Sequence, residues 1–82
     1  MKKIRFHPNV PTEVRAIEQD AAMTILVAIH RYAEHATGNV KALVGEFSGL
    51  LRLRVGNHRV IFEETEDAIT IHRIGDRRDV YR

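Results

Sequence analysis

Residues 49–62 place the tightest limit on what this chain can fold into. Apolar and polar residues alternate on both sides of Gly56 and Asn57, a pair typical of a short turn between antiparallel strands. One face of the resulting hairpin is apolar, and the opposite face gathers the arginines at positions 52, 54 and 59. A two-residue turn fixes the partners by counting outward: Val55 with His58, Arg54 with Arg59, Leu53 with Val60, Arg52 with Ile61 and Leu51 with Phe62.

The arginine-bearing face of this hairpin predicts a site for an anion. Like charges that lie opposite each other destabilise a sheet, so the grouping of Arg52, Arg54 and Arg59 indicates a bound anion. Residues 52–82 contain seven arginines and no lysine, and the planar arginine fork binds two phosphate oxygens at once. The same residues include six carboxylates, so a solvated surface of salt bridges is the alternative.

The rest of the chain predicts an α+β fold. Residues 2–7 alternate polar with apolar residues and indicate a strand that turns Ile4 and Phe6 inward. Thr12 is the expected cap of a helical stretch, and Asp20 is the expected cap of a second helix that makes it an αα-hairpin. A connector at residues 40–49, read as a short extended piece that ends in a turn at Ser48 and Gly49, precedes the arginine hairpin. We expect one domain over residues 1–82, with an N-terminal strand and a helical hairpin packed on an antiparallel sheet of about four strands.

A second turn, at residues 66–67, adds a further strand that is rich in β-branched residues. Counting outward from this turn pairs Phe62 with Ile71 and Ile61 with His72. The register places His72 on the face that carries the arginines. A slip of one residue would reverse this assignment, because neighbouring residues of a strand face opposite sides.

Composition argues against several kinds of site. The chain has no cysteine, and its five histidines lack the spacing of metal ligands, so we expect neither a metal nor a cofactor. The longest apolar run, at residues 21–29, is too short to span a bilayer. A strand pattern and a proline follow the basic start of the chain, where a secretory signal would have a long apolar segment. We therefore expect a soluble, cytoplasmic protein.

Two motifs resemble those of the RelE/ParE superfamily of bacterial toxins. The first is LRLRVGNHRVIF at residues 51–62, and the second is RIGDRRDVYR at residues 73–82. The two stand in the order and at the separation found in that family, whereas the N-terminal half agrees in architecture alone. The resemblance implies a RelE-like fold and a toxin that is encoded beside an antitoxin.

The resemblance also implies an activity. RelE-like members are endoribonucleases that cleave messenger RNA on the ribosome and inhibit translation, whereas ParE-like members share the fold but inhibit DNA gyrase. A diverged member that only binds its antitoxin is a third alternative. We expect the RelE-like activity, with ribosome-bound messenger RNA and a cognate antitoxin as partners.

Motif positions imply roles for the arginines. Arg52 and Arg54 stand where RelE-like toxins hold the RNA backbone, and Arg59 stands where they stabilise charge at the scissile phosphate. Arg77 or Arg78 matches a basic pair near the C-terminus, and we expect Arg77 in catalysis and Arg78 in RNA binding. The arginines of the hairpin are also suited to acidic residues of an antitoxin.

The proton-transfer group has two candidates. Cleavage by the RNA 2′-hydroxyl needs a base, and arginine is a poor one because it stays charged. Tyr81 matches the tyrosine proposed as the base in the family, but a tyrosine ordinarily titrates near pH 10 and needs cations nearby for this role. His72 is the rival, because imidazole titrates near neutral pH. Two positions depart from the family pattern: His58 replaces a tyrosine, and Asp76 replaces a histidine.

Overall fold

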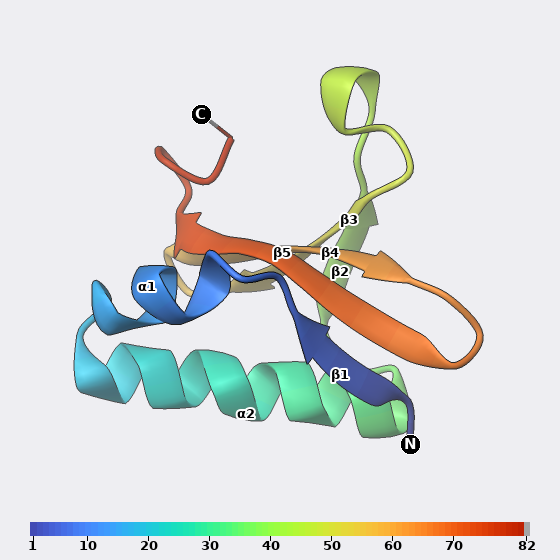
Figure 1. The fold of residues 1–82 in the computed structure, drawn as a ribbon, viewed down its shortest axis with the longest axis horizontal. Coiled ribbons are helices and arrows are strands. Elements are labelled where there is room, and N and C mark those ends of the chain that lie inside the picture. Colours follow the sequence, from blue (N-terminus) through green and yellow to red (C-terminus); the bar gives the residue numbers. More distant parts are fainter. Residues whose placement is uncertain (82) are drawn as a thin grey trace.

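A five-stranded sheet crosses the molecule, and two helices pack against one of its faces (Figure 1). This computed structural model describes residues 1–81. The elements in chain order are β1 (Lys3–Phe6), α1 (Val10–Arg15), α2 (Gln19–His35), β2 (Asn39–Ala42), the short 3₁₀ helix η1 (Gly45–Phe47), β3 (Leu51–Val55), β4 (His58–Glu64) and β5 (Ala68–Asp76). The strands lie in the order β1-β5-β4-β3-β2. Within residues 1–81, no helix has the length and apolar character needed to cross a membrane.

The predicted α+β class and helical hairpin are confirmed, but the sheet has one strand more than expected. The additional strand is β2, which begins one residue before the predicted connector and pairs antiparallel with β3. The sheet is also not wholly antiparallel, because β1 runs parallel to β5. The N-terminal strand thus lies beside the last strand of the chain, a pairing that no short turn could have signalled.

The strand registers agree with the sequence pattern except at one bulge. The pairing of β3 with β4 is the predicted one along its whole length. The pairing of β4 with β5 follows the prediction as far as Phe62 opposite Ile71. Beyond that pair Ile61 lies opposite Arg73, so the predicted pairing of Ile61 with His72 is wrong. His72 is the extra residue of a β-bulge, which leaves it outside the ladder.

Both helix caps lie upstream of the predicted residues. Asn9 is at the cap position of α1, so Thr12 lies inside the helix. Glu18 caps α2, because its carboxylate accepts hydrogen bonds from two backbone N–H groups at 3.1 and 3.0 Å. These two bonds lower the pKa of Glu18. Asp20 lies in the first turn of α2, where its negative charge favours the helix dipole.

The core lies between α2 and the sheet. Ile25, Ile29 and Ala33 recur along one side of α2 every four residues and are buried. Tyr32 packs edge to face on Phe62, with ring centroids 5.3 Å apart. The sheet contributes Leu53, Val60, Phe62, Ile69, Ile71 and Ile74 to this cluster. The intervening residues of β3 and β4 therefore lie on the opposite, open face of the sheet.

Two side chains take the place of a neighbouring strand along the edge of β5. β1 stops short and leaves residues 72–76 without a strand on that side. Asn9 Nδ2 donates to the carbonyl oxygen of His72 at 3.0 Å. The backbone N–H of Ile74 donates to Glu13 Oε1 at 2.8 Å. The start of α1 thus satisfies backbone groups that the sheet alone would leave unpaired.

Replacing Glu13 by alanine is expected to lower the free energy of unfolding by about 1–3 kcal/mol. The Ile74 N–H loses its acceptor, and Arg73 loses an ion pair whose atoms are 3.7 Å apart. Glu13→Gln keeps an acceptor and is expected to recover most of the loss. Urea unfolding measures both variants, with Glu63→Ala at an exposed position of β4 as the control. If both Glu13 variants lose the same free energy of unfolding, the ion pair with Arg73, and not the hydrogen bond from Ile74, is the source of the stabilisation.

A polar cluster ties the end of α2 to the sheet. The Tyr32 hydroxyl donates to Glu64 Oε1 at 2.6 Å, and Lys2 Nζ donates to Glu64 Oε2 at 2.7 Å. Burial, and then the bond to Glu64, raise the pKa of Tyr32 to about 12. The bonds from Lys2 and Tyr32 lower the pKa of Glu64.

The raised pKa of Tyr32 predicts a loss of stability in alkali. The unfolded chain releases this proton near the ordinary value of 10.0, and the folded chain holds it to about 12. The stabilisation is therefore complete below the lower value and is lost as the pH rises toward the upper one. Tyr32→Phe is expected to show a smaller fall in the free energy of unfolding over this interval. Urea titrations at its two ends test this, and equal falls in both proteins would contradict it.

Candidate functional site

Arg52, Arg54 and Arg59 lie together on the open face of the sheet, and we call this set the arginine face. Arg54 on β3 is directly opposite Arg59 on β4, and Arg52 lies one strand repeat away. Arg54 is exposed and Arg52 is half-buried, whereas only 8% of Arg59 is exposed. Within residues 1–81, none of the three forms an ion pair. The salt-bridged alternative therefore does not describe this face.

Arg59 is held by the turn of its own hairpin. Its Nη1 donates to the carbonyl oxygens of Gly56 at 3.1 Å and His58 at 3.0 Å. Burial lowers the pKa of Arg59, and the charges of Arg54 and Arg52 lower it further. A guanidinium nevertheless stays protonated at any physiological pH. The result is a fixed positive charge whose nearest charged neighbours repel it, an arrangement that a bound anion relieves.

Arg52 contributes a donor that has no acceptor. Its Nε is buried and has no hydrogen-bond partner within residues 1–81, while its Nη2 donates to Asn39 Oδ1 at 3.3 Å. Ile61 pairs with Arg52 and is only 1% exposed, so apolar surface lies beneath the charged groups. A buried donor without an acceptor costs about 1–3 kcal/mol.

The C-terminal tail, residues 77–81, folds back beside the hairpin turn. The Arg77 N–H donates to the Asn57 carbonyl oxygen at 3.1 Å, and the Val80 N–H donates to the Asp76 carbonyl oxygen at 3.1 Å. Asp76 Oδ1 accepts from the backbone N–H groups of residues 78 and 79 at 2.8 and 3.0 Å. These bonds help to lower the pKa of Asp76. The carboxylate that departs from the family pattern is therefore occupied in holding the tail.

The tail lies over the end of β5 that pairs with Arg59, because Val80 packs against Gly75, the residue opposite Arg59. The charge of Arg77 helps to lower the pKa of Arg59, and Tyr81 acts in the opposite direction. The charge of Arg78 acts on Asp76 instead, where it lowers the pKa of the carboxyl group. Of the two neighbouring arginines, Arg77 is thus the one whose charge acts at the arginine face.

Phe47, a residue that the sequence did not single out, contacts Tyr81. The loop that contains η1 and the C-terminal tail both rise from the sheet on the side away from α2 (Figure 1). The rings of Phe47 and Tyr81 meet edge to face, with centroids 5.5 Å apart and planes at 65°. The signal available in the sequence is an aromatic residue between two loop glycines, Gly45 and Gly49.

His72 does not join this group. Arg59 lies opposite Gly75, three residues further along β5 than His72. The His72 ring instead stacks on His7, with centroids 5.4 Å apart. Its Nε2 is buried and has no hydrogen-bond partner within residues 1–81. The tail that carries Tyr81 therefore lies at the level of Arg59 along the sheet, whereas His72 lies three residues away along β5.

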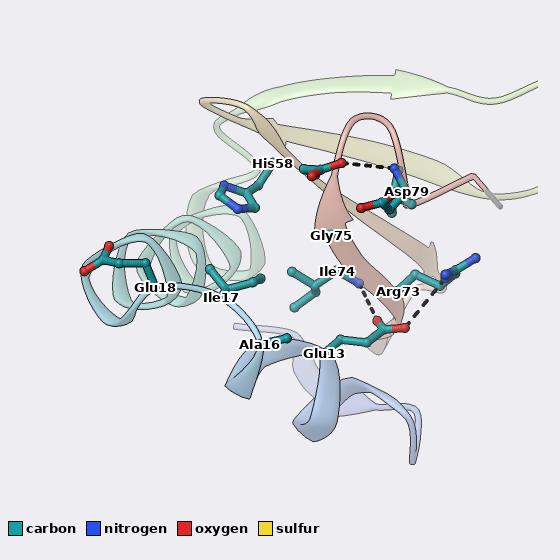
Figure 2. A pocket seen from close by; sticks show the side chains of 11 residues that line it. Glu13, Ala16, Ile17, Glu18, His58, Arg73, Ile74, Gly75 and Asp79 are labelled. Atoms are coloured by element: carbon teal, nitrogen blue, oxygen red, sulfur yellow. Dashed lines mark hydrogen bonds and ion pairs between the residues drawn. The ribbon is translucent and has the colours of Figure 1, made fainter.

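A cleft of about 360 Å³ lies between α1, the start of α2 and the end of β5 (Figure 2). Its carboxylates already have partners: Glu13 accepts from Ile74, and Glu18 accepts from the start of α2. Figure 2 shows the Glu13 carboxylate directed at both Ile74 and Arg73. Among residues 1–81, no group of three or more histidine, aspartate or glutamate side chains could hold a metal ion. The Glu13 and Glu18 carboxylates of this cleft thus bind backbone N–H groups of the fold.

Solved structures of toxins share this fold. A chain of the RelB–RelE antitoxin–toxin complex from Methanococcus jannaschii matches with a TM-score of 0.74 and 18% identity over 94% of each chain. A mutant of YafQ from E. coli matches with a TM-score of 0.81 and 10% identity over 100% of each chain. A chain of the YoeB–YefM complex from Staphylococcus aureus matches with a TM-score of 0.72 and 15% identity, over 90% of this chain and 94% of that one. The fold is therefore that of the RelE-like toxins.

A sequence model of a protein family identifies the family of this chain. No curated protein matches the chain significantly. The family model described as the ParE toxin of the type II toxin–antitoxin system parDE matches residues 4–81. The chain belongs to this family, and it is a toxin of the RelE/ParE superfamily.

Proposed function

We propose that this toxin is an endoribonuclease that cleaves messenger RNA on the ribosome, without a metal ion, and so inhibits translation. The proposal is carried by one observation, the grouping of Arg52, Arg54 and Arg59 on an open sheet face, with the tail that contains Arg77 and Tyr81 folded beside the turn of the same hairpin. Positive charge without carboxylate partners suits the phosphate backbone of RNA. A toxin with this target would act in the cytoplasm.

The proposed roles of the arginines follow their positions. Arg52 and Arg54 bind the RNA backbone, since they line β3 at the open side of the face. Arg59 and Arg77 act at the scissile phosphate, where they stabilise the negative charge that develops on its oxygens. Arg78 binds the backbone further out, beside Asp76.

Tyr81 is the proposed general base. Its ionised hydroxyl takes the proton of the RNA 2′-hydroxyl, and the 2′ oxygen attacks the adjacent phosphorus while the bond to the 5′ oxygen breaks. The leaving oxygen takes a proton from water, so the products are a 2′,3′-cyclic phosphate and a 5′-hydroxyl end. His72 is the alternative base, and its distance along β5 from Arg59 argues against it.

We infer that a cognate antitoxin is the protein partner. The RelE and YoeB proteins with this fold were solved in complexes with RelB and YefM. An antitoxin segment with acidic residues would complement the arginine face and cover the proposed RNA site. Binding of antitoxin and binding of RNA are then mutually exclusive.

Mapping of transcript ends after expression tests the proposal. The wild-type chain, induced without an antitoxin, is expected to stop growth and to produce new 5′ ends inside translated messages by primer extension. Arg5→Ala changes an exposed arginine of β1, outside the arginine face, and is expected to behave as wild type. Growth arrest with intact messages would overturn the proposal. The absence of any growth effect would point to a member that only binds its antitoxin.

Inhibition of DNA gyrase is the second candidate, and the family match favours it. The matching model is described as the ParE toxin, and ParE-like members are the gyrase inhibitors of the superfamily. This role needs a protein-binding surface and no general base. It predicts a DNA-damage response with intact messages, so the primer-extension experiment separates the two activities.

A further inference from the structure

We propose that Phe47 is a positioning residue, which holds the Tyr81 ring beside Arg59. The inference rests on the proposed function for the part that concerns catalysis, because it takes Tyr81 as the base. The contact that carries it is the edge-to-face packing of the two rings, with centroids 5.5 Å apart. The contact joins two segments that are far apart in sequence, the loop between β2 and β3 and the C-terminal tail.

Two hydrogen bonds and two glycines fix the backbone of the loop that carries Phe47. A hydrogen bond from the Leu43 N–H to the Leu50 carbonyl oxygen, 3.0 Å long, closes its base. Inside it, the Leu50 N–H donates to the Phe47 carbonyl oxygen at 3.0 Å. Gly45 and Gly49 have φ angles of +70° and +93°, in the left-handed region that residues with a Cβ rarely adopt. The two glycines thus set a path that another residue type would strain.

The backbone of the tail is anchored as far as Val80. The same contacts do not fix the Tyr81 side chain. Val80 is 1% exposed and packs against Gly75, and Asp76 accepts two backbone hydrogen bonds from the tail. Tyr81 itself is 37% exposed, and its hydroxyl makes no hydrogen bond within residues 1–81. Rotation about χ1 would carry the hydroxyl away from Arg59 without disturbing the anchored backbone. The ring of Phe47 restrains that rotation.

The size of the effect follows from the strength of such ring pairs. An edge-to-face pair contributes enough to change the ratio of two side-chain rotamers by roughly 3- to 10-fold. Loss of the Phe47 ring is therefore expected to lower kcat by at most about 10-fold, with little change in KM, because the RNA-binding arginines are untouched.

Fluorine labelling tests the positioning without any measurement of activity. The chain has two tyrosines, so 3-fluorotyrosine gives one signal for Tyr81 and one for Tyr32, which reports on the core. Phe47→Ala is expected to sharpen the Tyr81 fluorine line through faster motion and to leave the Tyr32 line unchanged. Val44→Ala, at a residue of the same loop that is 84% exposed, is the matched control and should change neither line. An unchanged Tyr81 line in Phe47→Ala would overturn the proposal.

A double-mutant cycle tests the catalytic consequence. If Phe47 acts through Tyr81, Phe47→Ala lowers kcat in the wild-type background but causes no further loss in Tyr81→Ala. Phe47→Trp retains an aromatic ring and is expected to recover most of the rate. Losses that add in the double variant would overturn the positioning role. If the wild-type protein cleaves no RNA, the proposed function fails, while the fluorine measurement still decides whether Phe47 holds Tyr81.

Discussion

Arg59→Ala is expected to lower the rate of RNA cleavage by about 100- to 1000-fold, the usual cost of removing a fixed donor that stabilises charge in a transition state. Arg59 is the buried member of the arginine face, and two carbonyl oxygens of the hairpin turn hold its Nη1. Its guanidinium is therefore placed before RNA arrives. Arg59→Lys keeps the charge but loses the planar fork, so it should recover only part of the rate.

The measurement is single-turnover cleavage of a ribosome-bound message, with thermal unfolding as the control for folding. We expect the Arg59→Ala protein to stay folded, because the change removes a buried charge that Arg52 and Arg54 repel. Arg5→Ala should cleave as wild type, since Arg5 lies on the edge strand β1, which β5 separates from β4 and β3. Cleavage at the wild-type rate by a folded Arg59→Ala protein would remove this residue from the reaction.

Tyr81→Phe is expected to lower kcat by about 100-fold or more, because it removes the proposed base. The substitution keeps the ring that packs on Phe47, so it tests the hydroxyl apart from the position of the side chain. His72→Gln is expected to change kcat by less than about twofold, since its ring stacks on His7 away from Arg59.

Single-turnover rates of the two variants decide between the candidate bases. If His72→Gln lowers the cleavage rate strongly and Tyr81→Phe hardly changes it, His72 is the base and Tyr81 is not. Little loss in either variant would leave the arginines as the source of catalysis. Because single-turnover kinetics separate chemistry from product release, a change in release cannot imitate either result.

The hairpin that carries the arginine face could be predicted because all of its determinants are local. Alternation and a two-residue turn fix the register, and β3 and β4 pair as counted. The bulge in β5 was not predicted, although the spacing of two isoleucines in the sequence is consistent with it. Ile71 and Ile74 are three residues apart and both join the core between α2 and the sheet, whereas residues three apart in a regular strand face opposite sides.

The parts of the site that could not be derived depend on contacts between distant segments. Tyr81 was assigned by the resemblance of the tail motif, since no pattern in residues 77–81 indicates where the tail folds. Phe47 was missed because its position depends on two glycines with positive φ and on a tail that lies more than 30 residues away. The strand β2 was expected only as a short extended piece of a connector, because nothing local shows that its four residues pair with β3.

The side chains of Asn9 and Glu13 have a consequence for the solubility of this toxin. An unpaired strand edge is a template on which a second chain can add a strand, and so a starting point for aggregation. Along residues 72–76 of β5, these two side chains occupy the carbonyl oxygen of His72 and the N–H of Ile74 that an incoming strand would need. The start of α1 thereby blocks strand addition along residues 72–76 of β5. The edges that remain open to another strand are the outer edges of β1 and β2.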